Sequence, residues 1–121
     1  MLSSMTPTFV FKEDKLESIL GSPGGSHIIT TVLHTLLAKI IFEQSIKSSV
    51  LNLRYHHQWV PDRIDIEPNA IDEKSQRSLE KLGHKLFIRT NYFGDMQAIS
   101  KEEGRWVGVS DWRSDGVPAG G

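Results

Sequence analysis

The stretch Gly21-Ser22-Pro23-Gly24-Gly25-Ser26 is followed at once by apolar residues at helical spacing from Ile28 to Ile41, and this junction decides the fold. Glycine has no side chain to obstruct a close approach of the backbone to a ligand. The first turn of a helix has unpaired N–H groups and the positive end of the helix dipole. Together these features make a site for negative charge, either a bound anion or an oxyanion that develops during a reaction. A tight strand-to-helix connection without any ligand accounts for the same segment.

The residues on either side of this junction predict a hairpin and a long helix. Residues 7–12 are apolar on both faces and predict a buried strand, and residues 16–20 predict its hairpin partner. Ser26 is the expected N-cap of the helix, which extends to about residue 43. The apolar stripe of this helix is broad, so we expect the helix to be largely buried.

The rest of the chain predicts shorter elements. Ser45 is expected to begin a second helix, and a third helix is capped by Asp72 and stopped by Gly83. Further strands are expected over residues 64–66, 84–90, 95–101 and 105–109, the last two forming a hairpin. This order of elements predicts an α+β fold with largely antiparallel sheets, in a single domain over residues 1–121.

Composition excludes several classes of function. The net charge is −1, with both signs interspersed, and the absence of a basic stripe argues against a nucleic-acid partner. The chain has no cysteine, which excludes disulfides, thiolate nucleophiles and cysteine metal sites. No apolar run is long enough to span a bilayer, and residues 1–7 lack the pattern of a signal peptide.

The adjacent histidines His56 and His57 raise the question of a metal site. Adjacent side chains point apart on a strand or loop, and neither a carboxylate nor a third histidine stands at ligand spacing. We therefore expect these rings to pack or to make hydrogen bonds, and we predict no metal site. Asp111 and Arg113, near the C-terminus, are expected to form an ion pair that fixes the C-terminal segment.

Several motifs occur together in a family-like order along the whole chain. They are residues 2–8 (Leu-Ser-Ser-Met-Thr-Pro-Thr), 21–26, 28–33, 56–62, 83–84, 97–99 and 110–113. In this order and spacing the sequence resembles the small subunit of γ-glutamyltransferases, also called γ-glutamyltranspeptidases or glutathione hydrolases.

The resemblance implies a fold, a reaction and a set of partners. The fold would be part of an N-terminal-nucleophile hydrolase, a four-layer αββα sandwich. A precursor would cleave itself, and the new N-terminal threonine would attack the γ-amide of glutathione. The γ-glutamyl group would then pass to water, an amino acid or a peptide, without a metal or organic cofactor. The expected partners are the large subunit and the rest of the small subunit, and the expected location is periplasmic or secreted.

The resemblance also assigns roles to four residues. Ser3 and Ser4 match the paired serines that bind the α-carboxylate of the glutamyl group. Gly24 and Gly25 match the glycine pair whose backbone N–H groups form the oxyanion hole, which is the role that the turn itself suggests.

The sequence also departs from the family pattern. The nucleophilic threonine would lie upstream of Ser3, so we expect the chain to be the C-terminal part of a small subunit and to be inactive alone. Leu53 stands where proline is usual, Trp112 replaces the proline of an Asp-Pro-Arg motif, and His27 stands where arginine is common. We expect an exposed sheet edge and self-association of the isolated chain. A related N-terminal-nucleophile acylase and a non-catalytic α+β interaction fragment remain alternatives.

Overall fold

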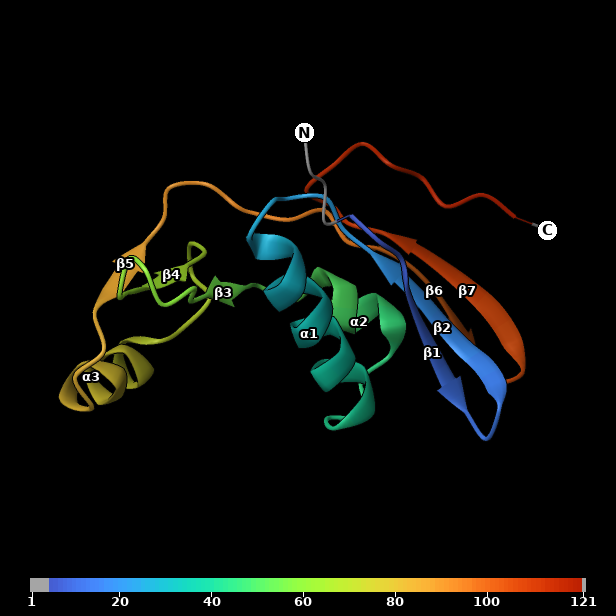
Figure 1. Ribbon diagram of the computed structural model, residues 1–121, viewed down its shortest axis with the longest axis horizontal. Helices are drawn as coiled ribbons and strands as arrows, with labels where there is room; N and C mark the ends of the chain where they lie inside the picture. The colour runs from blue at the N-terminus through green and yellow to red at the C-terminus, as the bar shows by residue number, and fades with distance from the viewer. Residues whose placement is uncertain (1–4, 121) are drawn as a thin grey trace. The chain divides into compact units, whose positions relative to one another are not determined.

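The computed structural model describes residues 5–120, and these divide into two compact units (Figure 1). Unit 1 comprises Met1–Asn52 and Gly94–Gly121, and unit 2 comprises Leu53–Phe93. Within the described residues, no helix has both the length and the apolar character needed to cross a membrane. The assignment of residues 1–121 to one domain stays a prediction.

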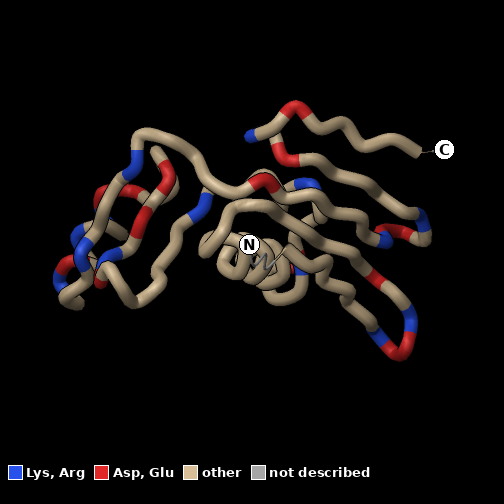
Figure 2. Tube along the Cα trace, turned by 45° about the horizontal axis from the view of Figure 1, so that its top comes forward, with Lys and Arg blue, Asp and Glu red and all other residues tan. Residues whose placement is uncertain are grey.

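Unit 1 is built on a four-stranded antiparallel sheet with the order β1-β2-β6-β7. Its strands are β1 (Thr8–Lys12), β2 (Lys15–Gly21), β6 (Gln97–Glu102) and β7 (Arg105–Ser110). Both predicted hairpins are present, and the central pairing joins β2 to β6 with Gly21 opposite Gln97. Charged residues of both signs gather at the two hairpin tips (Figure 2).

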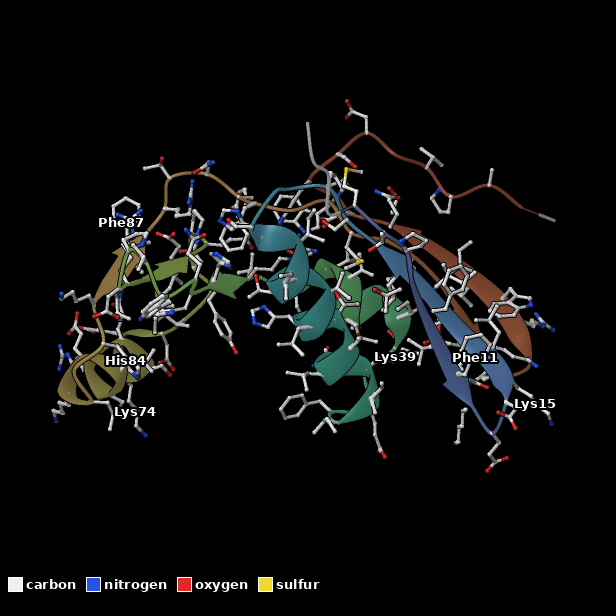
Figure 3. The ribbon with its side chains drawn as sticks, in the orientation of Figure 1. Phe11, Lys15, Lys39, Lys74, His84 and Phe87 are labelled. Atoms are coloured by element: carbon white, nitrogen blue, oxygen red, sulfur yellow. The ribbon has the colours of Figure 1, made fainter. Side chains whose placement is uncertain are left out.

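Two helices, α1 (His27–Ile40) and α2 (Ile46–Leu51), cover one face of this sheet. The core between the helices and the sheet consists of Leu20, Ile46, Val50, Met96 and Ala98. The predicted cap of α2 is confirmed, because the N–H of Ser48 donates to Ser45 Oγ over 3.1 Å. Lys39 of α1 is labelled in Figure 3. Its Nζ lies 3.2 Å from Glu102 Oε1 of β6, and this ion pair joins the helix to the sheet.

The opposite face of the sheet, and one side of α1, are open in this chain. Phe9, Ile99 and Trp106 are each about half exposed on the sheet, at 53%, 46% and 52%. On α1, Ile29 is 73% exposed. The predictions of a buried first strand and a largely buried helix are therefore wrong for this chain. Apolar residues on both sides of an element need a partner on both sides, and here only one side is covered.

Unit 2 is a three-stranded sheet with one helix. Its strands are β3 (Tyr55–His56), β4 (Ile64–Ile66) and β5 (Leu86–Ile88), and its helix is α3 (Glu73–Lys81). β4 pairs antiparallel with β3 and parallel with β5. The two-residue strand β3 was not predicted, and β5 is shorter than the expected strand over residues 84–90.

The buried carboxylate of Glu67 holds the two ends of unit 2 together. Its Oε2 accepts the N–H of Arg54 over 2.8 Å, and its Oε1 accepts the N–H of Phe93 over 2.9 Å. Glu67 is fully buried, so these charge-assisted bonds replace the water that it would otherwise bind. The Glu67 carboxylate thus links Arg54 and Phe93, which are 39 positions apart. A direct bond from Arg54 Nη1 to Phe93 O joins the same two residues.

The predicted cap of α3 is also confirmed. Asp72 Oδ1 accepts the N–H of Ser75 over 2.7 Å. The hydrogen bonds from Ser75 lower the pKa of the Asp72 carboxyl below its ordinary value, because they favour the charged form. The helix ends before Gly83, whose φ of 93° is the left-handed conformation expected of a C-terminal stop.

Candidate oxyanion site

The glycine turn lies between the last residue of β2, Gly21, and the first residue of α1, His27. Gly24 and Gly25 both have positive φ, at 132° and 58°. A Cβ atom at Gly24 would lie 3.7 Å from the Cα of Gly94, whereas a Cβ at Gly25 would meet nothing within 4 Å. The conformation, more than the space available, therefore favours glycine at these two positions.

The carbonyl groups of Pro23, Gly24 and Gly25 in this turn all accept hydrogen bonds. Ser22 Oγ donates to Pro23 O over 2.7 Å. The N–H of His27 donates to Gly24 O over 3.1 Å, and the N–H of Ile28 donates to Gly25 O over 3.3 Å. These bonds fix the orientation of successive peptide planes at the start of α1.

The N–H groups of Gly24 and Gly25 belong to two of these fixed planes. In a trans peptide the C=O and N–H bonds point in opposite directions. The Gly24 N–H therefore points away from the hydrogen bond at Pro23 O, and the Gly25 N–H points away from the hydrogen bond at Gly24 O. Within residues 5–120, neither N–H donates a hydrogen bond to the protein. Two successive donors, both oriented by the turn, are thus left for an acceptor such as an oxyanion.

Ser26 does not cap α1 as predicted. Its backbone is already helical, with φ −64° and ψ −22°, and its side chain makes no capping hydrogen bond. The reason is local: the first N–H groups of the helix are taken by the carbonyl groups of Gly24 and Gly25. A serine hydroxyl is therefore not needed at this helix start.

A polar network packs against the turn from the residues just before β6 and from the C-terminal segment. The N–H of Asp95 donates to Ser22 Oγ over 3.1 Å, and Asp95 Oδ1 accepts from Ser114 Oγ over 2.8 Å. Asp111 forms the predicted ion pair with Arg113, at 2.9 Å, with both side chains buried. The bond between Asp95 and Ser22 was missed from sequence, because these residues are 73 positions apart and neither belongs to a charge pattern.

An apolar cavity of about 530 Å³ lies on the open face of the sheet, beside the first half of the turn. It is lined mainly by Met5–Pro7, Ile19–Pro23, Gln97–Ile99, Gly108, Val109, Pro118 and Ala119. Gly24 and Gly25 do not line it. Its apolar walls suit side chains better than a charged glutamyl group, so we separate this cavity from the candidate oxyanion site.

The other predicted site residues have different outcomes. Ser3 and Ser4 lie outside the described residues. His56 Nε2 lies 3.0 Å from Gln58 Oε1, and His57 Nε2 lies 3.3 Å from Asp62 Oδ1. These are the hydrogen bonds expected of structural histidines. Across residues 5–120, no group of three or more histidine or carboxylate side chains is arranged to hold a metal ion.

Comparison with known proteins gives a consistent result. A family model described as Gamma-glutamyltranspeptidase matches residues 1–121. The glutathione hydrolase proenzyme of Escherichia coli is 36% identical over 120 residues, which cover 98% of this chain and 20% of that protein. Glutathione hydrolase proenzyme 1 of Schizosaccharomyces pombe is 36% identical over 119 residues, which cover 97% and 19%. The chain thus spans about a fifth of the length of these relatives.

Solved structures show the same similarity. A mutant γ-glutamyltranspeptidase of Helicobacter pylori superimposes with a TM-score of 0.86 at 38% identity, over 93% of this chain and 62% of that chain. The Pseudomonas nitroreducens enzyme in complex with L-DON gives 0.87 at 33% identity, over 98% and 63%. The predicted α+β class, part of an N-terminal-nucleophile hydrolase, is confirmed. With a family match over every residue and the same backbone arrangement in solved members, this chain belongs to the gamma-glutamyltranspeptidase family.

Proposed function

We propose that these 121 residues supply the oxyanion site of an enzyme that cleaves the γ-glutamyl amide of glutathione. The enzyme would transfer the γ-glutamyl group to water, an amino acid or a peptide. One observation carries the proposal: the N–H groups of Gly24 and Gly25 are adjacent, oriented by the turn and not used within the described chain. Family membership supplies the reaction class that such a pair would serve.

The proposed chemistry assigns one task to each group. The hydroxyl of the attacking threonine adds to the γ-carbonyl carbon as its proton passes to a base that, like the threonine, would lie outside these residues, and the carbonyl oxygen becomes negatively charged in the tetrahedral intermediate. Collapse of the intermediate breaks the C–N bond, the leaving amine takes up that proton, and the γ-glutamyl ester left on the threonine is then cleaved by water or an acceptor amine. The two glycine N–H groups donate to that oxygen, and losing one such donor costs about 10²–10³ in turnover in comparable sites. The hydroxyls of Ser3 and Ser4 donate to the α-carboxylate of the glutamyl group. The attacking threonine lies outside these 121 residues.

We further propose that the chain is the C-terminal portion of a small subunit, made from a precursor that cleaves itself. The open sheet face with Phe9, Ile99 and Trp106 and the exposed side of α1 support this placement, because such apolar surfaces need a covering partner. The rest of the small subunit and the large subunit would provide that cover.

The test compares the isolated chain with a full-length protein that carries it. The full-length protein should release p-nitroaniline from γ-glutamyl-p-nitroanilide, and the purified 121-residue chain should not. Turnover by the isolated chain would overturn the assignment of the nucleophile to a segment outside it. In the full-length protein, Ser3→Ala combined with Ser4→Ala should raise KM, because substrate binding loses two hydroxyl donors; an unchanged KM would remove that role.

A purely structural role is the competing function, and the exposed apolar surface alone is compatible with it. In that case this chain would only pack against a partner chain. The two accounts differ in what happens when the glycine N–H groups are removed or turned. Catalysis requires a loss of turnover, whereas packing predicts none.

A further inference from the structure

Ser22 is a buried serine placed directly before the oxyanion turn, with 6% of its surface exposed. Its Oγ–H donates to Pro23 O over 2.7 Å, and its oxygen accepts the N–H of Asp95 over 3.1 Å. The hydroxyl thus uses both its donor and an acceptor position. One of these bonds is local, and the other joins Ser22 to Asp95, 73 positions away in the segment just before β6.

The local bond acts on the peptide plane that carries the Gly24 N–H. Pro23 O and the Gly24 N–H belong to the same planar unit, so holding the oxygen fixes the direction of the hydrogen. Without this bond, rotation of the plane about the φ angle of Gly24 would meet little resistance, because glycine tolerates a wide range of φ. Ser22 is therefore the side chain that sets where the Gly24 N–H points.

The neighbouring plane is held in a different way. Gly24 O accepts the N–H of His27, which is part of the backbone of α1, and His27 Nδ1 also lies 3.3 Å from the same oxygen. The Gly25 N–H is thus oriented by the helix backbone, which a side-chain substitution leaves in place. Only the first of the two donors depends on a single hydroxyl group.

The hydroxyl of Ser22 is itself fixed by the network behind it. Asp95, which donates to Ser22 Oγ, is held through its carboxylate by Ser114 Oγ at 2.8 Å and Gln97 Nε2 at 2.6 Å. The next residue, Met96, donates its N–H to Asp111 Oδ2 over 3.0 Å. The Asp95 N–H donates to the Ser22 oxygen and so holds the hydroxyl group in place, while the hydroxyl hydrogen is donated to Pro23 O.

We propose that Ser22 is a positioning residue for the oxyanion site, acting through the Pro23 carbonyl on the Gly24 N–H. The proposal rests on the function proposed above. Ser22→Ala removes the bond that holds the first peptide plane, without touching the Gly25 donor or the serines assigned to the carboxylate. We expect kcat to fall by about 10-fold to 100-fold, which does not exceed the fall of about 10²–10³ that follows when one donor is removed entirely. KM should change by less than about threefold, since the interaction is used in the transition state.

The experiment uses the full-length protein with Ser22→Ala, Ser22→Thr and Ser22→Cys. Turnover of γ-glutamyl-p-nitroanilide is expressed per mole of cleaved chain, so that poor processing does not count as poor catalysis. Thr keeps the hydroxyl and should restore kcat to near the wild-type value; Cys, a weak donor of similar size, should be intermediate. Ser78→Ala is the matched control, because that hydroxyl only donates to Lys74 O on exposed α3.

The outcomes separate this proposal from the one on which it depends. An inactive wild-type protein overturns the proposed function and this proposal with it. An active wild type with unchanged kcat in Ser22→Ala overturns the role of Ser22 alone. Equal losses in the Ala and Thr variants would indicate simple packing and would also overturn it. If Ser22→Ala does not fold, the remaining variants test the proposal. It predicts that kcat is similar for Ser and Thr and lower for Cys, and a Cys variant as active as the wild type contradicts it.

Discussion

Alanine at Gly24 and alanine at Gly25 should have very different effects, although the two positions are adjacent. Gly25 has a φ of 58°, close to the left-handed helical region, and an added Cβ would meet nothing within 4 Å. Alanine there costs about 1–2 kcal/mol of strain and can keep the same backbone. Gly24 has a φ of 132°, which a residue with a side chain rarely adopts. Alanine there relieves its strain by turning the peptide plane.

The size of the effect follows from the donor that the turned plane carries. Gly24→Ala should lower kcat by about 10²–10³, equivalent to about 2.7–4 kcal/mol, because the turned Gly24 N–H would no longer face the proposed oxyanion. Gly25→Ala retains its N–H direction and should keep kcat within about threefold of wild type. Gly25→Asn is the matched control, because asparagine tolerates the left-handed region. Steady-state hydrolysis of γ-glutamyl-p-nitroanilide by the full-length protein measures both. Equal losses at the two positions would refute the reasoning.

Three further predictions address the rest of the chain. Glu67→Ala should destabilise unit 2 by about 2–6 kcal/mol, because two buried N–H groups lose their acceptor at about 1–3 kcal/mol each, and limited proteolysis within residues 53–93 should become faster; an unchanged cleavage pattern would show that the carboxylate is dispensable. Because the folded pKa of Asp72 is lowered, its contribution to α3 is present above the ordinary pKa and is lost as the pH falls through the folded pKa. The protection factors for amide hydrogen exchange in α3, which correct for the intrinsic pH dependence of exchange, should therefore fall in acid for the wild type more than for Asp72→Asn, and identical pH profiles of the protection factors would contradict this. The isolated chain should self-associate through its open sheet face, and Phe9→Ser with Trp106→Ser should reduce its light-scattering mass; a monomeric wild-type chain would exclude this surface as the cause.

Local signals were sufficient to predict most elements from the sequence. Ser45 and Asp72 mark helix starts by side-chain bonds three residues away, so both caps could be predicted from residue type and spacing. The two hairpins of unit 1 follow from apolar strands around short charged turns. In each of these cases the physical cause lies within a few residues of its effect.

The features that could not be predicted depend on distant parts of the chain. Burial of β1 and α1 depends on what covers their second side, which their own sequence does not reveal. Ser26 is a residue type typical of caps, but the N–H groups of His27 and Ile28 donate to the carbonyl oxygens of Gly24 and Gly25 instead. The glycine pair was predicted as a site from composition and resemblance and stays a prediction, whereas the role proposed for Ser22 depends on a contact with Asp95, 73 positions away.

The central claim is that the Gly24 N–H donates to the oxyanion, and replacing that amide by an ester tests it most directly. The ester substitutes an oxygen for the N–H and leaves the glycine without a side chain. In the full-length protein the account predicts that kcat falls by about 10²–10³ while KM stays within about threefold. The same replacement at Gly120, in the C-terminal segment, should leave turnover unchanged. Wild-type turnover by the Gly24 ester would contradict the account.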